Sequence, residues 1–127
     1  MINERKFSKC SICGNIISYV NNAGPEVICC GQKMQEIKPN TTDAATEKHV
    51  PAITRENNKL TVNVGSAPHP MTPEHHIAWI VAAEGSRTQR VVLPNDKPAA
   101  AEFVVSGDLP VTVYAYCNLH GLWAAEG

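Results

Sequence analysis

Four cysteines near the N-terminus have the type and spacing of metal ligands: Cys10, Cys13, Cys29 and Cys30. The first two form a C-x2-C pair, which lets two thiolates reach one ion, and Gly14 allows a tight turn behind them. The second two complete a set of four sulfurs that suits tetrahedral zinc or a single iron ion. Unligated thiols or two disulfides are the alternatives, but adjacent cysteines rarely both pack in a core. The pattern predicts a four-thiolate metal site and does not separate iron from zinc.

A second group of potential ligands lies in the other half of the chain, which holds all five histidines and the fifth cysteine. Cys117 and His120 are spaced like a strand end and the turn after it, so both can bind one ion. His69 and His75 flank a proline-stiffened loop that could hold two imidazoles rigidly, and His49 would complete the set. Any one of these histidines alone could be an ordinary surface or core residue. Their clustering with a cysteine favours a second metal site.

His75 and His76 compete for one place in this second site. They are neighbours at the expected start of a strand, where successive side chains point to opposite faces. Only one of them can therefore bind the ion, and periodicity does not decide which.

The segment that carries the four cysteines is too short to form a hydrophobic core. Units below about 40 residues generally need a metal, disulfides or a partner to fold, so an ion bound here would be structural. We assign residues 1–37 to this N-terminal domain. The polar, proline-broken stretch 38–43 is typical of a linker and opens a second domain, 38–127.

The second domain is predicted to be all-β, because short β-branched runs alternate with turn residues and no long helical periodicity is present. The expected strands lie near 51–55, 59–64, 76–83, 88–93, 101–105, 110–117 and 122–125. About seven short strands favour an immunoglobulin-like β-sandwich, although a small barrel would give similar signals. We interpret the aromatic residues of these strands as packing residues: Trp79, Tyr114, Tyr116 and Trp123.

Composition excludes several other classes of protein. With 127 residues there is no room for two large domains, and a formal net charge of -1 gives no basic field for nucleic acid. The longest apolar run, 77–83, is far shorter than the roughly 20 residues that span a bilayer. The first residues lead into no apolar signal segment, so we expect a soluble, cytoplasmic protein. An odd number of cysteines in such a protein favours metal binding over disulfides.

These blocks of sequence resemble the desulfoferrodoxin family, the two-iron class of superoxide reductases. The matching motifs occur in the family's order and cover almost the whole chain: Cys10-x2-Cys13 with Cys29-Cys30, Glu47-Lys48-His49-Val50-Pro51, His69-Pro70-Met71, His75 with Trp79, and Cys117-Asn118-x-His120-Gly121. The resemblance implies a desulforedoxin-like domain with an Fe(Cys)4 site, centre I. It also implies an immunoglobulin-like catalytic domain with an Fe(His)4Cys site, centre II.

The resemblance also implies a ligand set and a reaction. The equatorial ligands of centre II would be His49, His69, His75 and His120, with Cys117 axial and His76 not a ligand. Superoxide would be reduced by one electron to hydrogen peroxide, without oxygen evolution. The electron donor would be a rubredoxin-like protein, and the chain would form a homodimer.

Two charged residues before His49 have catalytic roles in this family. The Glu47 carboxylate would occupy the sixth position of the resting ferric iron. Lys48 would attract the superoxide anion and order water for proton delivery. Without the resemblance, an ordinary solvated charge pair would be the simpler interpretation of both residues.

The implied ligand set suits a small anion. Five protein ligands leave an iron ion one open position, which catalysis at a metal requires. A ferrous ion with four neutral imidazoles and one thiolate carries one net positive charge, which attracts superoxide. Lys48 would add to this field, and such focusing raises association by roughly 10 to 1,000-fold. The Cys117 thiolate donates electron density to the metal and so influences its potential.

Three other interpretations keep part of the pattern. A rubredoxin-like electron carrier would use the four-cysteine site and leave Cys117 and four histidines unexplained. A binding module stapled by zinc would be colourless. Dismutation would require the same site to oxidise superoxide as efficiently as it reduces it. The sequence identifies neither the electron donor nor an electron path from centre I to centre II.

Overall fold

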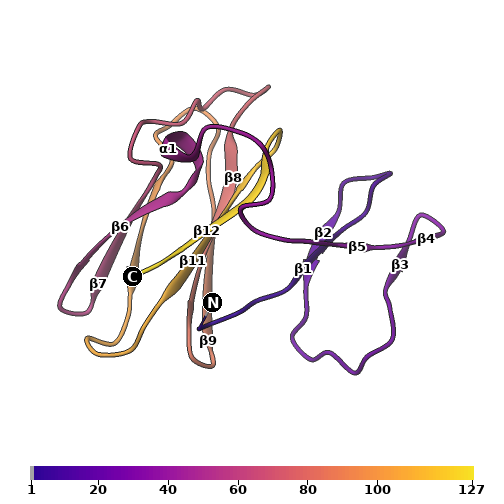
Figure 1. Cartoon of the computed structure of the whole chain (residues 1–127), viewed down its shortest axis with the longest axis horizontal. Helices are drawn as coiled ribbons and strands as arrows, with labels where there is room; N and C mark the ends of the chain where they lie inside the picture. Colours follow the sequence, from indigo (N-terminus) through magenta and orange to yellow (C-terminus); the bar gives the residue numbers. More distant parts are fainter. Residues whose placement is uncertain (1) are drawn as a thin grey trace. The chain divides into compact units, whose positions relative to one another are not determined.

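The computed structural model describes residues 2–127, which form two compact units (Figure 1). The smaller unit spans residues 5–38, and the larger one contains residues 39–127 together with the N-terminal residues up to Glu4. Within residues 2–127 no helix approaches the length and apolar character needed to span a bilayer; the helix α1 (Thr46–His49) is a single turn. The chain is mainly β, as predicted.

The smaller unit consists of two small antiparallel sheets and has almost no hydrophobic core. Its strands are β1 (Phe7–Lys9), β2 (Ile16–Ser18) and β5 (Gln35–Ile37), in the order β2-β1-β5, and the pair β3 (Ile28–Cys29) and β4 (Gln32–Lys33). Among residues 5–38 only Phe7, Ser8 and Cys10 are buried. Burial this small cannot offset the entropy of ordering the chain, so the unit needs another source of stability.

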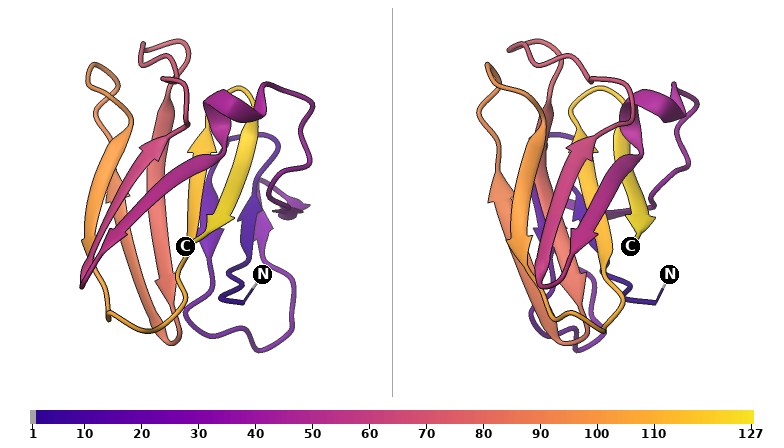
Figure 2. Two further views of the ribbon diagram at one scale, coloured as in Figure 1. Left: turned by 60° about the vertical axis from the view of Figure 1, so that its left-hand side comes forward. Right: turned by 90° about the vertical axis from the view of Figure 1, so that its left-hand side faces the viewer.

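The larger unit is a sandwich of two antiparallel sheets, and all seven predicted strands are present in it (Figure 2). One sheet has the order β10-β7-β6 and the other the order β12-β11-β8-β9. The strands are β6 (Pro51–Glu56), β7 (Lys59–Val64), β8 (Ile77–Glu84), β9 (Arg87–Val92), β10 (Ala100–Val104), β11 (Thr112–Cys117) and β12 (Gly121–Glu126). The chain changes sheet after β7, β9 and β10, as in immunoglobulin-like sandwiches.

Alternating burial along the strands builds the core between the two sheets. In β7, Leu60, Val62 and Val64 point inward and their neighbours are more exposed. They meet inward-facing residues of β8 and β11 in one continuous cluster. Every residue of β11 is buried, because this strand is central in its sheet and the outer face is also covered, partly by the stacked rings of Trp79 and Tyr116.

A buried ionic clasp joins the two sheets at the end where β6 and β8 finish. Glu84 is 4% exposed, and its carboxylate accepts a hydrogen bond of 2.8 Å from the Ser106 N–H. The guanidinium groups of Arg87 and Arg55 lie 3.5 and 4.0 Å from the same carboxylate. Arg55 also donates to the carbonyl oxygens of Ser106 and Gly127. The clasp therefore connects β6, β8, β9 and the loop after β10 through one buried carboxylate.

We expect Glu84→Ala to lower the free energy of unfolding by about 3 kcal/mol, because it leaves the Arg55 guanidinium partly buried without its counter-charge. Chemical denaturation followed by tryptophan fluorescence measures this. Glu102→Ala is the matched control, since its ion pair with Lys59 is exposed and should contribute less than about 1 kcal/mol. Equal effects of the two substitutions would show that the clasp is not a special stabilising contact.

Candidate metal centres

The structure brings the sulfur atoms of Cys10, Cys13, Cys29 and Cys30 together in the smaller unit. All four atoms lie within 4.8 Å of one another, and none of these cysteines is in a disulfide. The Sγ atoms of Cys13 and Cys29 are 3.6 Å apart. Sulfurs bound tetrahedrally to one ion at about 2.3 Å would be about 3.8 Å apart, whereas a disulfide is only about 2.05 Å long. The spacing fits a four-thiolate metal site.

The adjacent cysteines share one site because the chain reverses between them. Successive residues of an extended strand point to opposite faces, which would separate Cys29 from Cys30. Cys29 ends β3, and Cys30 adopts φ +53, in the left-handed region, followed by Gly31 at φ +74. This turn lets both sulfurs approach Cys10 and Cys13.

Neighbouring groups shift the pKa values of the thiols at this site in opposite directions. The backbone N–H groups of Cys13 and Ile12 point at the Cys10 sulfur and lower the pKa of this thiol to about 6. Hydrogen bonding to the other thiols, Cys13 foremost, raises the pKa of Cys30 to about 12. Four sulfurs at this distance cannot all ionise unless a cation joins them. The donor set therefore fits a divalent or trivalent metal ion.

A second cluster lies at one end of the sandwich and contains His49, His69, His75, Cys117 and His120, whose ligand atoms are within 4.8 Å of one another. These residues come from four places: the end of α1, the loop between β7 and β8, the end of β11, and the turn before β12. The structure thus gathers all the residues expected at the second site, from segments up to 71 residues apart.

Ring nitrogen atoms of the imidazoles in this cluster lie close to one another. The Nδ1–H groups of His49 and His69 donate to the carbonyl oxygens of Ala45 and Pro70, both at 2.7 Å. In the neutral rings the Nε2 atoms then carry no proton, yet they lie only 3.1 Å apart. Nδ1 of His120 lies 3.1 Å from the same Nε2 of His49. Such close acceptors repel unless a cation lies between them, so the cluster fits a metal ion.

The four rings are arranged as a square. Neighbouring ring centroids, in the order His49, His69, His75 and His120, are 4.6 to 5.1 Å apart, and the diagonal from His49 to His75 is 6.5 Å. Nitrogens bound to an ion at about 2.1 Å would be about 3.0 Å apart at right angles and about 3.4 Å apart in a tetrahedron. The observed 3.1 Å favours the right-angled arrangement. Nε2 of His75 is buried without a hydrogen-bond partner among residues 2–127, as expected of a ligand atom.

The fifth member, Cys117, is fully buried at the end of β11. Its sulfur accepts a hydrogen bond of 3.4 Å from the His120 N–H. The pairing of β11 with β8 shifts at this point: Tyr116 pairs with Trp79, but Cys117 pairs with Ile77. Such a β-bulge redirects the side chains after it, and bulges are common beside active sites. Here it lies directly before the thiolate.

Burial favours the neutral form of three of the imidazoles, those of His49, His69 and His75. It is the largest cause that lowers the pKa values of His49 and His75, and it lowers the pKa of His69 to about 4. Neutral rings are the form that binds metal ions. The positive charge of Lys48 is a smaller cause that lowers the pKa values of His49 and His75 in the same direction.

Of the two adjacent histidines, only His75 belongs to the cluster. The His76 ring is held elsewhere, because its Nδ1 donates to the carbonyl oxygen of Thr72 at 2.8 Å. The His76 backbone N–H donates to the Asn118 side chain, and β8 begins one residue later than predicted.

Two residues that were not predicted to belong to the site support the cluster. Trp123 packs as predicted, but it also stacks on the His49 ring at 4.9 Å and donates from Nε1 to the His120 carbonyl oxygen. Asn118 links the turn after Cys117 to the loop that contains His75. In the sequence it was visible only as a member of the motif Cys117-Asn118-x-His120-Gly121, between two candidate ligands.

The turn α1 is held against the loop after β7. Its Glu47 carbonyl oxygen accepts hydrogen bonds from the Ala67 N–H at 2.8 Å and from the Ser66 hydroxyl at 3.2 Å. A Cβ atom at Gly65 would lie 2.6 Å from that oxygen and 2.9 Å from the carbonyl carbon of Lys48. Only glycine therefore permits this approach. The side chains of Glu47 and Lys48 remain exposed.

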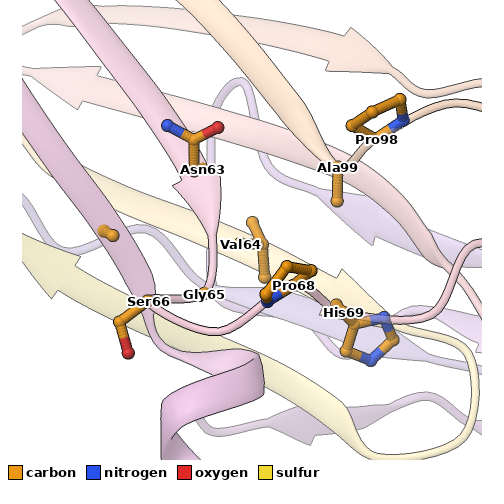
Figure 3. Close-up of a pocket in the computed structure, with 9 residues that line it drawn as sticks. Asn63, Val64, Gly65, Ser66, Pro68, His69, Pro98 and Ala99 are labelled. Atoms are coloured by element: carbon orange, nitrogen blue, oxygen red, sulfur yellow. The ribbon is translucent and has the colours of Figure 1, made fainter.

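The same loop forms the wall of a hollow of about 350 Å³ on the flank of the sandwich (Figure 3). Gly65, Ser66, Pro68 and His69 line it from one side, and Pro98 and Ala99 from the other. His69 is the one member of the metal cluster among its lining residues. The loop thus borders open space on one side, and its contacts with α1 fix it from the other.

We expect Gly65→Ala to destabilise the metal-loaded protein by about 1–3 kcal/mol, because the new methyl group pushes the α1 backbone away from the loop. Gly107→Ala is the control: its nearest neighbour would be 3.8 Å away, so the substitution should be neutral or stabilise by about 0.4–1 kcal/mol. Denaturant unfolding measures both. A Gly65→Ala protein as stable as the control would disprove the close approach.

Comparisons with known proteins agree with this organisation. The family model for desulfoferrodoxin matches residues 41–126, and that for the desulfoferrodoxin N-terminal domain matches residues 3–37. The chain is 43% identical to the desulfoferrodoxin of Syntrophotalea carbinolica over 100% of both chains. It is 42% identical to that of Nitratidesulfovibrio vulgaris over 99% of both.

Solved structures show the same similarity. The crystal structure of the superoxide reductase from Treponema pallidum has a TM-score of 0.78 and 34% identity, covering 96% of this chain and 98% of that one. A one-iron superoxide reductase from Giardia intestinalis has a TM-score of 0.55 and 31% identity, covering 64% of this chain and 97% of that one.

Proposed function

The chain belongs to the desulfoferrodoxin family of superoxide reductases, and we propose that it reduces superoxide to hydrogen peroxide at the five-residue cluster. His49, His69, His75, His120 and Cys117 would hold the catalytic iron, and the four N-terminal cysteines would hold a second iron. The four-cysteine group and the group of four histidines and one cysteine are both consistent with the two iron sites of this family. The observation that carries the proposal is the square of four imidazoles with a buried thiol beside it.

When bound, a ferrous ion in this cluster would supply the electron that converts superoxide to peroxide. The residues around it determine what can reach the site. Four neutral imidazoles add no negative charge, so the one thiolate leaves the centre positive and attractive to an anion. The His120 N–H donates to the Cys117 sulfur and stabilises its negative charge in a buried place. Solvent would supply the two protons that complete hydrogen peroxide.

Lys48 would attract superoxide to the cluster and order water beside it. It is exposed on α1, directly before His49, and its charge is felt by the imidazoles of His49 and His75. Glu47, one residue earlier, would act as the carboxylate that closes the sixth position in the resting state. In support, the Glu47 charge raises the pKa of His49, opposing the effect of Lys48.

The N-terminal domain would be stabilised by its iron. We assign residues 1–37 to this domain and 38–127 to the catalytic one; the compact units divide between 38 and 39, but the residues up to Glu4 belong to the larger unit. Exposed apolar side chains of the small domain support a homodimer: Ile12, Val20 and Ile28.

The electron donor would be a rubredoxin-like carrier. The free cysteines agree with a cytoplasmic location.

The proposal is tested with the purified full-length protein. We expect two irons per chain, a sulfur-to-iron absorption band when centre II is oxidised, and rapid appearance of that band after a superoxide pulse on the reduced protein, with one peroxide formed per superoxide. A colourless zinc protein, or iron at the cysteine site alone, would contradict the proposal. Oxygen evolution in proportion to peroxide would instead identify dismutation.

Lys48→Ala should lower the second-order rate constant with superoxide by about 10-fold at low ionic strength and weaken its dependence on salt, because the local positive field is lost. Pulse radiolysis at several salt concentrations measures both. Lys59→Ala is the matched control, since Lys59 begins β7 and His69 lies beyond the opposite end of that strand. If both variants react like the parent, Lys48 does not steer the substrate.

Glu47→Ala should shift the absorption band of the oxidised centre without slowing association, because it removes a carboxylate and not a positive charge. Glu47→Gln separates charge from size. Absorption spectra of the oxidised proteins and the rate constants for superoxide are the measurements. A band identical to that of the parent in both variants would rule out the carboxylate role.

A further inference from the structure

Asn118 joins the two segments that carry four of the five cluster residues. It lies directly after Cys117 and two residues before His120. Its side-chain Nδ2–H donates to the carbonyl oxygen of Glu74 at 2.9 Å, and its Oδ1 accepts from the His76 N–H at 2.9 Å. Its backbone N–H donates to the His76 carbonyl oxygen at 3.2 Å. These bonds flank His75 on both sides.

We propose that Asn118 is a positioning residue, which sets the spacing between the 69–76 loop and the 117–120 turn and so fixes the His75 ring relative to the Cys117 thiolate. The inference rests on the proposed function, because it assigns a role within the same iron site. It requires no contact between Asn118 and the substrate.

The place of Asn118 in the sheet explains why a side chain is needed. Regular pairing of β11 with β8 ends at Cys117, where the register shifts and Cys117 faces Ile77. Beyond this point the two strands lead into separate loops. Asn118 extends the connection by using its side-chain oxygen for the His76 N–H and its amide N–H for Glu74. Without the side chain, the backbone bond of 3.2 Å to His76 is the remaining link that Asn118 makes to this loop.

His75 depends on such a link more than His49 and His69 do. The rings of His49 and His69 are fixed by hydrogen bonds from Nδ1 to backbone carbonyl oxygens. For His75, the hydrogen bonds are made by the backbone: its N–H donates to the Thr72 hydroxyl at 3.1 Å, and its carbonyl oxygen accepts from the Thr72 N–H at 2.9 Å. Its ring position therefore follows the backbone of the loop, which Asn118 attaches to the thiolate-bearing turn.

A matched hydrogen-bonding residue exists far from the cluster. The Asn3 side chain donates to the Pro110 carbonyl oxygen at 2.8 Å and accepts from the Gly85 N–H at 2.9 Å. Gly85 directly follows β8, whereas Asn118 bonds to the segment directly before that strand. Asn3→Ala thus removes the same two kinds of bond at the other end of the strand and serves as a control for general loss of stability.

The experiment compares Asn118→Ala, Asn118→Asp and Asn3→Ala with the parent as iron-loaded, full-length proteins. Two quantities are measured: the rate at which the reduced protein releases centre II iron to a ferrous chelator, and the position and width of the sulfur-to-iron band after oxidation. Supporting residues around metal sites typically change metal affinity by 10–100-fold. We expect about 10-fold faster release and a shifted, broader band in Asn118→Ala.

Asn118→Asp keeps the acceptor for the His76 N–H but loses the donor to Glu74, so its release rate should lie between those of the parent and Asn118→Ala. Asn3→Ala should keep the release rate and the band of the parent even if its melting temperature falls. Release rates and bands equal to those of the parent in both Asn118 variants would overturn the positioning role. If Asn118→Ala does not fold, the test uses Asn118→Asp alone, and a release rate and band equal to those of the parent would again overturn the positioning role. A parent protein without iron at centre II would overturn the proposed function itself.

Discussion

The structure of the catalytic end depends on one electrostatic constraint, the approach of imidazole nitrogens to within 3.1 Å of one another. The Nδ1 protons of His49 and His69 are committed to backbone carbonyl oxygens, so neither neutral ring can place a proton between the two Nε2 atoms. Burial lowers the pKa values of both rings, which opposes relief by protonation. A metal ion held by these nitrogens would remove the repulsion and take the place of the missing protons. Metal binding and the ordering of four separate segments are therefore coupled.

The sandwich can hold such a site because its stability comes from elsewhere. The core between the sheets is continuous, and the Glu84 clasp closes the end opposite the loops that carry the ligands. The loops at the catalytic end are then free to be shaped by short-range contacts: a hydrogen-bonded α1 backbone, a glycine that allows close approach, and the Trp123 ring against His49. The small N-terminal unit has no comparable core, so its four-cysteine site must stabilise the fold as well as bind the ion.

Much of this architecture could be predicted from the sequence, because strands and metal ligands leave strong local signals. The seven strands of the sandwich follow from alternating β-branched runs, and the cysteine pairs follow from their spacing. Periodicity could not choose between His75 and His76, because the His76 ring donates to the Thr72 carbonyl oxygen and its backbone N–H donates to the Asn118 side chain, 42 residues away. For the same reason the supporting role of Trp123 could not be separated from ordinary packing. The bulge before Cys117 depends on the register of two strands, which one strand's sequence does not determine.

The chemistry of the two centres differs because of their net charge and exposure. A ferrous ion with four thiolates would carry two net negative charges, which repel superoxide, and four sulfurs already complete its tetrahedral coordination. The cluster of His49, His69, His75, His120 and Cys117 would combine the same ion with a single negative ligand, so its charge would be positive and would attract the anion. Its members His75 and His120 are only partly buried, which leaves the cluster close to solvent, while the Cys117 thiolate is fully enclosed. The imidazoles of His75 and His120 are therefore the part of the cluster that an anion from solvent could reach, and the Cys117 sulfur is the most shielded part. These differences in net charge and exposure explain why the site in the larger domain, and not the four-cysteine site, is suited to the reaction.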